Sequence, residues 1–168
     1  MDKLDELTAK QEIQENLLRY ARGVDRRDWP LVRACYHDDA IDWHGEFHGD
    51  ADAFIAWVSE RHATVPFSMH FMGNCLIEVA SPTVATAETY FVAMSRREPA
   101  DGAPTDIEVF GRYVDRFEKR DDGVWRVADR KVVYDSTRTL DSTNHLRRIQ
   151  GVLGQRNSED AVYLSAAL

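Results

Sequence analysis

Two side chains of this chain have the chemical types that proton transfer requires. Asp25 stands in "VDRRDW" (residues 24–29), and His70 stands in "FSMHFMGN" (residues 67–74). A neutral histidine has a pKa that suits a general base, and a carboxylate bonded to its ring fixes the tautomer and stabilises the imidazolium that forms. If the fold brings the two side chains together, they form a catalytic pair.

Each of the two side chains also has an ordinary structural explanation. His70 can be a half-buried histidine that hydrogen-bonds only to the backbone. Asp25 follows a helical pattern, and a negative charge at the C-terminal end of a helix costs about 0.3–1 kcal/mol unless a cation lies nearby. A solvated ion pair would meet that need as well as an imidazolium does. The arginines that offer such a pair are Arg22, Arg26 and Arg27.

The residues before Asp25 are predicted to form an amphipathic helix. Four side chains recur at spacings of four, three and four and therefore share one helix face: Ile13, Leu17, Tyr20 and Val24. Thr8 and Gln11 have the spacing of a capping box, which predicts that the helix begins there. Tyr20 thus belongs to the buried stripe. Asp28 is predicted to cap a second short helix with Pro30 in its first turn.

His70 lies in the first of four long predicted strands. From Phe67 onwards the apolar pattern has period two, and turn sequences divide it into runs at about 67–79, 83–97, 106–119 and 124–136. Upstream, "AIDWHGEFHGD" predicts two short strands with a turn at Gly45, followed by a helix from about Asp52 to Val65. Helices followed by an antiparallel meander indicate an α+β fold, in which a curved sheet wraps around helices on one side.

The strand that holds His70 has two different faces. The odd-numbered positions are all apolar or glycine, so this face is predicted to pack on the core: Met69, Phe71, Gly73, Cys75, Ile77 and Val79. The even-numbered positions mix polar and large apolar side chains, which suits the lining of a pocket: Ser68, His70, Met72, Asn74, Leu76 and Glu78.

Composition and charge narrow the classes of function. The 168 residues are 43% hydrophobic and carry a net charge of −8, which argues against a nucleic-acid partner because such partners need clustered Lys and Arg. No stretch approaches roughly 18 apolar residues, and the start lacks the apolar segment of a signal peptide, so a cytoplasmic protein with no membrane partner is expected. Cys35 and Cys75 lack disulfide or metal-site spacing and are expected to be reduced.

No linker or repeat divides the chain. A single domain is therefore expected over residues 1–168, with its core at about 5–136 and a C-terminal extension at 137–168. One further amphipathic helix is expected in that extension, from "TRTLDSTNHLRRIQGVLGQ" onward. The apolar side chains on both faces of the sheet also suggest a second layer from another subunit, so a homodimer or homotrimer is expected.

The segment "HDDAIDWHGEFH" gathers histidines and carboxylates. It matches no metal-binding motif, and the turn at Gly45 separates His44 from His48, so no metal site is expected. The large side chains here and on nearby elements are instead candidate substrate-binding residues of a hydrophobic pocket: Trp43, His44, Phe47, Trp57, Met69, Met72 and Tyr134.

Three motifs together resemble one family. They are "IQENLLRYARGVDRRDW", "FSMHFMGN" and "YVDRFEKRDDGVWRVADRKVVY", and they resemble the SnoaL-like family of the nuclear transport factor 2-like superfamily. That family includes bile acid 7α-dehydratase, hexachlorocyclohexane dehydrochlorinase and, more distantly, scytalone dehydratase. The resemblance covers roughly residues 5–136. It implies a cone-shaped α+β barrel, with a curved antiparallel sheet wrapped around N-terminal helices, and no cofactor.

The resemblance also implies four catalytic residues. The Asp–His dyad of the family falls on Asp25 and His70. A tyrosine that precedes the Asp in the bile acid dehydratase matches Tyr20, and an arginine on the last strand matches Arg130. Ala93 stands near the place where the bile acid dehydratase carries a further aspartate, which argues against the same substrate.

The reaction implied by these residues is β-elimination. His70 would remove a proton next to an electron-withdrawing group, and Asp25 would orient its ring. Tyr20 would donate a hydrogen bond, and Arg130 would stabilise the negative charge that develops. Structural explanations stay open for the last two residues. Tyr20 can be a core residue, and Arg130 can pair with one of three carboxylates, namely Asp129, Asp135 or Glu118.

The sequence therefore favours a lyase of the dehydratase type. Its expected substrate is a small, hydrophobic, hydroxylated molecule that is steroid-like, alicyclic or aromatic-derived. Two alternatives stay open. One is a non-catalytic ligand-binding or oligomer-forming protein that resembles the β subunit of ring-hydroxylating dioxygenases. The other is an isomerase of the ketosteroid isomerase type, which uses an aspartate as its base.

Overall fold

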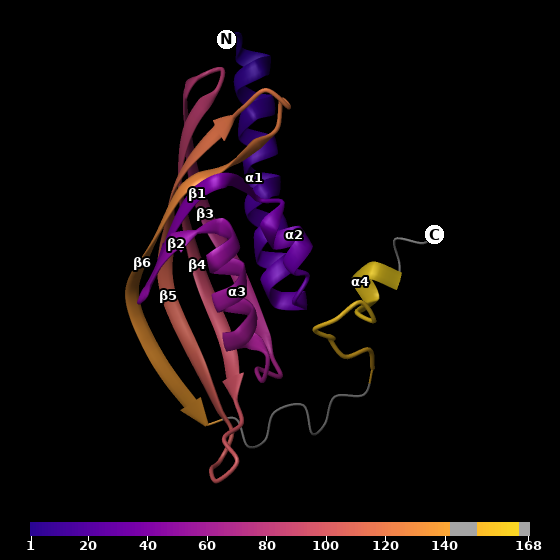
Figure 1. The fold of residues 1–168 in the computed structure, drawn as a ribbon. Coiled ribbons are helices and arrows are strands. Elements are labelled where there is room, and N and C mark those ends of the chain that lie inside the picture. The colour runs from indigo at the N-terminus through magenta and orange to yellow at the C-terminus, as the bar shows by residue number, and fades with distance from the viewer. Residues whose placement is uncertain (142–150, 165–168) are drawn as a thin grey trace.

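The computed structural model describes residues 1–141 and 151–164 (Figure 1). The predicted order of helices followed by long strands is confirmed. The elements are α1 (Lys3–Arg26), α2 (Trp29–Arg33), β1 (Tyr36–His44), β2 (Phe47–Asp50), α3 (Ala51–His62), β3 (Ser68–Ser81), β4 (Val84–Arg97), β5 (Thr105–Lys119), β6 (Trp125–Asp141) and α4 (Ala161–Leu164).

Helix α1 begins earlier than the sequence pattern predicted. Asp2, and not Thr8, is the N-cap residue, because the side chains of Asp2 and Asp5 each accept a hydrogen bond from the other's backbone N–H. The predicted apolar stripe, including Tyr20, is buried. The helix ends where Arg27 adopts a left-handed conformation with φ 55°. Asp25 therefore lies in the last turn, as predicted.

The six strands form one open, curved sheet in the order β2-β1-β6-β5-β4-β3. Strands β3 to β6 are the predicted antiparallel meander. The sheet as a whole is mixed, because β1 pairs with β6 in the parallel direction. A period-two pattern shows that a segment is a strand but not which distant strand it joins or in which direction, so the sequence could not predict this pairing.

Strand β3 contains a bulge that changes which side chains face the core. The pairing with β4 slips between Met72 and Cys75, and the extra residue reverses the alternation. Before the bulge, the even-numbered His70 and Met72 point inward, and after it the odd-numbered Cys75 and Ile77 do. The prediction that all odd positions pack on the core was therefore wrong for the first half of the strand.

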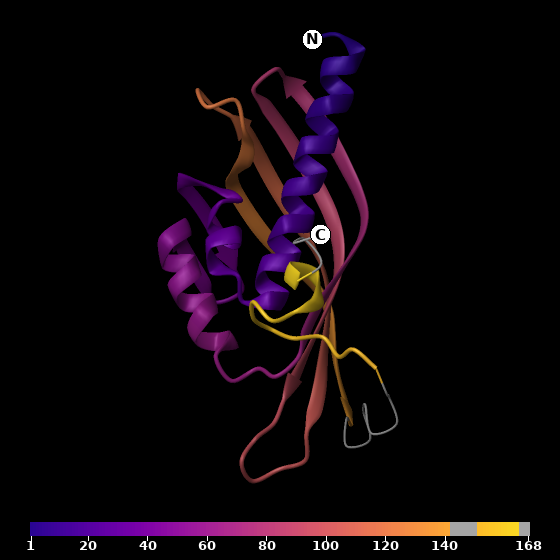
Figure 2. The same ribbon diagram turned by 90° about the vertical axis from the view of Figure 1, so that its right-hand side faces the viewer.

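The three N-terminal helices lie on one side of the sheet, with α1 extended along it (Figures 1 and 2). Gly23 lets α2 approach α1 closely, since a Cβ atom at this position would lie 2.6 Å from the side chain of Val32. Aromatic and aliphatic side chains from the helices and the inner sheet face form the core, among them Ile13, Phe54 and Phe117. The helices thus cover only part of the inner face of the sheet.

The C-terminal extension begins as a strand. Residues Thr137–Asp141 continue β6 and pair with the first residues of β5, so the helix expected from Thr137 onward does not begin there; residues 142–150 of that expected helix lie outside the described residues. The segment 151–164 returns to the C-terminal end of α1 (Figure 2). Within the described residues, none of the helices is long and apolar enough to cross a membrane.

Candidate functional site

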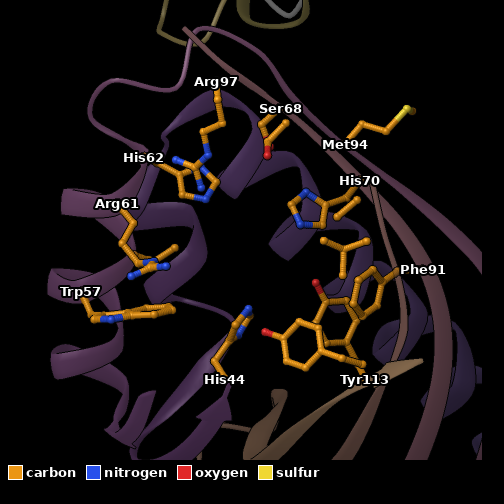
Figure 3. Close-up of a pocket in the computed structure, with 15 residues that line it drawn as sticks. His44, Trp57, Arg61, His62, Ser68, His70, Phe91, Met94, Arg97 and Tyr113 are labelled. Carbon is orange, nitrogen blue, oxygen red and sulfur yellow. The ribbon is translucent and has the colours of Figure 1, made fainter. Parts of the chain in front are cut away.

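A cavity of about 220 Å³ opens between helix α3 and the inner faces of β3, β4 and β5 (Figure 3). Three small residues of β3 and β4 leave room for it, namely Ser68, Ala93 and Ser95. His70 lines the cavity and pairs directly across the strands with Ala93. The histidine predicted to be a base therefore borders a cavity that a small molecule can enter.

Asp25 and His70 are in direct contact. Nδ1 of His70 lies 2.7 Å from Oδ1 of Asp25, and both side chains are only 10% exposed. The other carboxylate oxygen, Oδ2, accepts the backbone N–H of His70 at 2.9 Å, and the hydroxyl of Ser68 donates to Oδ1 at 3.2 Å. The carboxylate is therefore held by two neighbouring residues of β3, and its orientation toward the imidazole is fixed.

This contact determines which ring nitrogen of His70 can act as a base. A carboxylate whose two oxygens accept hydrogen bonds selects the tautomer with the proton on Nδ1. The lone pair of the neutral ring is then on Nε2, for which no partner occurs among residues 1–141 and 151–164. The arrangement can accept a proton at Nε2 and stabilise the resulting imidazolium through Asp25.

Arg130 lies in the core beside the cavity and does not line it. Its guanidinium is fully buried and forms two hydrogen bonds with Asp115, at 2.8 and 2.7 Å. This partner differs from the three carboxylates considered from the sequence. The guanidinium also stacks on the rings of Tyr20 and Tyr113, at 4.2 and 4.4 Å from their centroids. Its charge is thus shared between one carboxylate and a cage of aromatic rings.

Tyr20 is likewise a core residue that the cavity does not reach. It is 1% exposed, and burial raises the pKa of its hydroxyl. Its ring packs edge to face against Tyr113, with the centroids 5.6 Å apart. Tyr113, in contrast, lines the cavity, and burial raises its pKa well above the usual value, so it stays protonated. The alternation of inward and outward side chains along β5 could have identified Tyr113 as an inward-facing residue.

Three of the seven predicted substrate-binding residues line the cavity: His44, Trp57 and Tyr134. The other four do not. Trp43 and Met69 are 45% and 40% exposed because strand alternation turns them to the outer face, where Trp43 stacks on the ring of His48. Phe47 and Met72 pack against the core instead. The size and polarity of a residue did not reveal which face of its strand the cavity would use.

His62 was not predicted from the sequence, but it lines the cavity from the last turn of α3. A signal was present, because Phe54, Val58 and His62 are spaced by four residues and therefore share one helix face. Nδ1 of His62 lies 2.9 Å from Nη2 of Arg156. Burial, and then the positive charge of Arg156, lower the pKa of His62 to about 3. His62 is therefore neutral near pH 7.

Neutral His62 should make the protein less stable in acid. In the unfolded chain a histidine binds a proton below about pH 6.5, whereas folded His62 binds one only near pH 3. Because the unfolded state then holds more protons, stability should fall as the pH decreases through this window. In thermal unfolding between pH 7 and pH 4, His62→Gln should lose less stability than the wild type. The matched control His48→Gln, which replaces an exposed histidine, should show the same dependence of stability on pH as the wild type. If His62→Gln shows that dependence too, folded His62 is not the neutral histidine described here.

Arg156 attaches the C-terminal segment to the helix end that carries Asp25. Its guanidinium donates to the backbone carbonyls of Val24, Asp25 and Val65, at 2.9, 2.9 and 2.6 Å. A cation at this position also satisfies the terminal carbonyls of α1 and interacts favourably with the helix dipole. The side chain thus fixes the last turn of α1 from a position 131 residues later in the sequence, and no local pattern could predict such a contact.

Arg156→Ala is expected to destabilise the protein by about 1–3 kcal/mol, because partly buried carbonyls lose their donors. Arg156→Lys should recover part of this loss, since a lysine can reach only some of the carbonyls. Urea unfolding measures the free energy, and limited proteolysis should show faster cleavage within 151–164. A matched loss of an exposed arginine that pairs within α1, Arg19→Ala, should cost less than about 1 kcal/mol. Equal effects of the two substitutions would show that Arg156 does not fix the last turn of α1.

Within the described residues, no three His, Cys, Asp or Glu side chains converge in a way that could hold a metal ion. Cys35 and Cys75 are free thiols, as predicted. The polar groups that line the cavity are histidines, tyrosines, serines and cationic side chains.

Comparison with known proteins identifies the fold. The model of the SnoaL-like domain matches residues 5–131. No curated protein sequence matches the chain significantly. Among solved structures, a type 2 hexachlorocyclohexane dehydrochlorinase is similar with a TM-score of 0.75 and 18% identity, over 84% of this chain and 95% of that one.

Two structures from Novosphingobium aromaticivorans are also similar. A scytalone dehydratase-like protein has a TM-score of 0.72 and 21% identity, over 87% of this chain and 94% of its own. A protein assigned as the β subunit of an aromatic-ring-hydroxylating dioxygenase has a TM-score of 0.62 and 21% identity, over 83% of this chain and 95% of its own. At these identities the similarity establishes the nuclear transport factor 2-like fold alone, because one fold can carry different functions.

Proposed function

The chain belongs to the SnoaL-like domain family, and from that premise we propose that it is a cofactor-independent lyase. The reaction is elimination of water from a small, hydrophobic, hydroxylated molecule. The observation that carries the proposal is the 2.7 Å contact between Asp25 and His70, made by a histidine that lines a cavity. The carboxylate of Asp25 accepts hydrogen bonds from the hydroxyl of Ser68 and from the backbone N–H and the ring of His70. A histidine with a purely structural role would not need a carboxylate held in this way.

The proposed elimination uses His70 on the cavity wall and Asp25 behind it. Nε2 of His70 removes a proton from a carbon next to a carbonyl group, and the C–H electron pair becomes the new C=C bond. The C–O bond at the neighbouring carbon breaks, and the hydroxyl group leaves as water after taking the proton from the imidazolium. Asp25 stabilises the imidazolium between these two transfers.

Tyr113 is the proposed hydrogen-bond donor to the substrate carbonyl. It lines the cavity and keeps its proton, because burial holds its pKa well above the usual value. Tyr20 and Arg130 pack on its ring from the core side. We therefore assign these two residues to the positioning of Tyr113, through which the charge of Arg130 strengthens the donor.

The size of the cavity narrows the class of substrate. Its volume of about 220 Å³ lies below the roughly 300–1,000 Å³ of pockets that hold drug-sized ligands. Among the substrate types expected from the sequence, an alicyclic or aromatic-derived compound with one or two rings fits better than a steroid-like one. Trp57 and Phe91 provide apolar walls for such a ring (Figure 3).

A non-catalytic role is the second candidate, and the outer face of the sheet favours it. Four large apolar side chains are exposed on β3, β4 and β5: Phe71, Leu76, Tyr90 and Val114. Exposed apolar surface of this kind is typical of interfaces, and we propose a homodimer or homotrimer. An isomerase with an aspartate base is disfavoured, because both oxygens of Asp25 are engaged and Asp25 does not line the cavity.

Proton abstraction can be tested before the substrate is known. One- and two-ring β-hydroxy carbonyl compounds are incubated with the protein in D₂O, and NMR follows deuterium uptake at the carbon next to the carbonyl together with formation of the unsaturated product. A lyase should show both, an isomerase that abstracts the proton should show exchange without loss of water, and a binding protein should show neither. The absence of exchange and elimination across the panel, in protein that binds these compounds, would support the binding role instead.

A further inference from the structure

The wall of the cavity opposite His70 is cationic, although the protein is strongly acidic. Arg61, His62 and Arg97 lie on this wall, as Figure 3 shows. The cavity lining contains no Asp or Glu among the residues that the structure describes, whereas the whole chain has a net charge of −8. Cationic side chains gathered on one wall of a cavity favour the binding of anions.

The two arginines of this wall differ in the partners they already have. Arg61 pairs with Glu46 at 2.6 Å and lies over the ring of Trp57, 4.8 Å from its centroid. Arg97 has no carboxylate within ion-pair distance among residues 1–141 and 151–164. Its neighbour Arg96, on the other face of the strand, forms two hydrogen bonds with Asp106. Arg97 is therefore the cation of the wall whose charge is available to a ligand.

His62 adds a neutral hydrogen-bond donor to the charge of Arg97. The guanidinium of Arg156 can only donate, so Nδ1 of His62 must accept its hydrogen bond. The ring proton is then on Nε2, and the N–H group belongs to a ring that lines the cavity. The positive charge of Arg97 is near enough to this ring to help keep it uncharged. A guanidinium and an adjacent N–H donor together match the two oxygens of a carboxylate.

We propose that Arg97 and His62 form a carboxylate-binding subsite, so that the molecule bound in the cavity is a small hydroxylated ring compound with a carboxylate group. This inference rests on the proposed function for the reaction at His70, but the binding of the anion does not depend on turnover. The carboxylate anchors one end of the ligand on the cationic wall. The opposite end then faces Nε2 of His70, across the cavity.

The test compares benzoate with benzamide, which have nearly the same shape but differ in charge. Binding to the ¹⁵N-labelled protein is followed by NMR, through the ring resonances of His62 and His70. Benzoate should bind about 10- to 100-fold more tightly than benzamide, as expected for hydrogen bonds to a charged group. Arg97→Gln should remove most of this preference and leave benzamide binding unchanged. The matched control Arg116→Gln, which removes an exposed arginine outside the cavity, should retain the preference.

Three results would overturn the subsite: equal binding of the two probes, undetectable binding of benzoate, or a preference that persists in Arg97→Gln. None of them depends on catalysis, so the dyad could still be active on an uncharged substrate. Conversely, if the protein proves to catalyse no elimination, a benzoate preference that Arg97→Gln abolishes still supports the subsite as part of a binding protein.

Discussion

Asp25→Asn is expected to lower kcat for elimination by about 10⁴-fold, the effect typical of a base held in the wrong tautomer. The carboxylate accepts hydrogen bonds from the ring of His70, from its backbone N–H and from Ser68. An asparagine has only one accepting oxygen, and its NH₂ group would donate to Nδ1. The ring proton would then move to Nε2, so the neutral ring would no longer present a lone pair to the cavity.

Steady-state kinetics on the substrate identified by the D₂O screen measure this effect, and circular dichroism verifies that the variant is folded. The matched control is Asp106→Asn, which makes the same chemical change in an ion pair with Arg96 that the cavity does not contact. It should retain kcat to within about threefold, since neither side chain of this pair lines the cavity. If Asp25→Asn also stays within tenfold of the wild type, the Asp–His pair is not the catalytic base.

Arg130→Met is expected to have the largest effect on stability, a loss of about 3–5 kcal/mol. Arg130 and Asp115 form a fully buried ion pair, and removal of the arginine leaves the carboxylate without its partner. Burial already raises the pKa of Asp115 even with the arginine present. Urea unfolding monitored by tryptophan fluorescence gives the free energy directly.

The double variant Arg130→Met with Asp115→Leu isolates the cause of this loss. It replaces both charges with apolar side chains and should recover most of the stability, because no buried charge is left unpaired. A double variant that is no more stable than Arg130→Met would show that the ion pair is not the main source of the stability. The arginine would then stabilise the fold mainly through its contacts with three aromatic rings, those of Tyr20, Tyr36 and Tyr113.

The features that could be predicted from the sequence are those with a local physical cause. The stripe that contains Tyr20 follows from helical spacing, and the meander of β3 to β6 follows from period-two alternation between turn residues. The contact of Asp25 with His70 was suggested by family resemblance. Spacing alone could not distinguish it from an ion pair with a neighbouring arginine, because residues 45 positions apart are brought together only by the packing of α1 on β3.

Other features depend on long-range geometry that no local pattern encodes. One inserted residue in β3 reverses the strand face after Met72, which is why Met69 is exposed and His70 reaches the cavity. Asp115 became the partner of Arg130 because β5 and β6 pair in a register that places the two side by side. Arg156 reaches the end of α1 from the far end of the chain. In each case the position of the side chain is set by strand register or by a contact between distant parts of the chain.

The most direct test of the account is the tautomer of His70, measured by ¹⁵N NMR of the imidazole ring at a pH where the ring is neutral. We expect Nδ1 to carry the proton in the wild-type protein, in accord with its contact with Asp25 at 2.7 Å, and we expect Asp25→Asn to shift the proton to Nε2. If Nε2 carries the proton in the wild type, His70 does not present a base to the cavity, and the proposed elimination is excluded. If Nδ1 carries the proton in Asp25→Asn as well, Asp25 does not set the tautomer, and the proposed role of the Asp–His pair is contradicted.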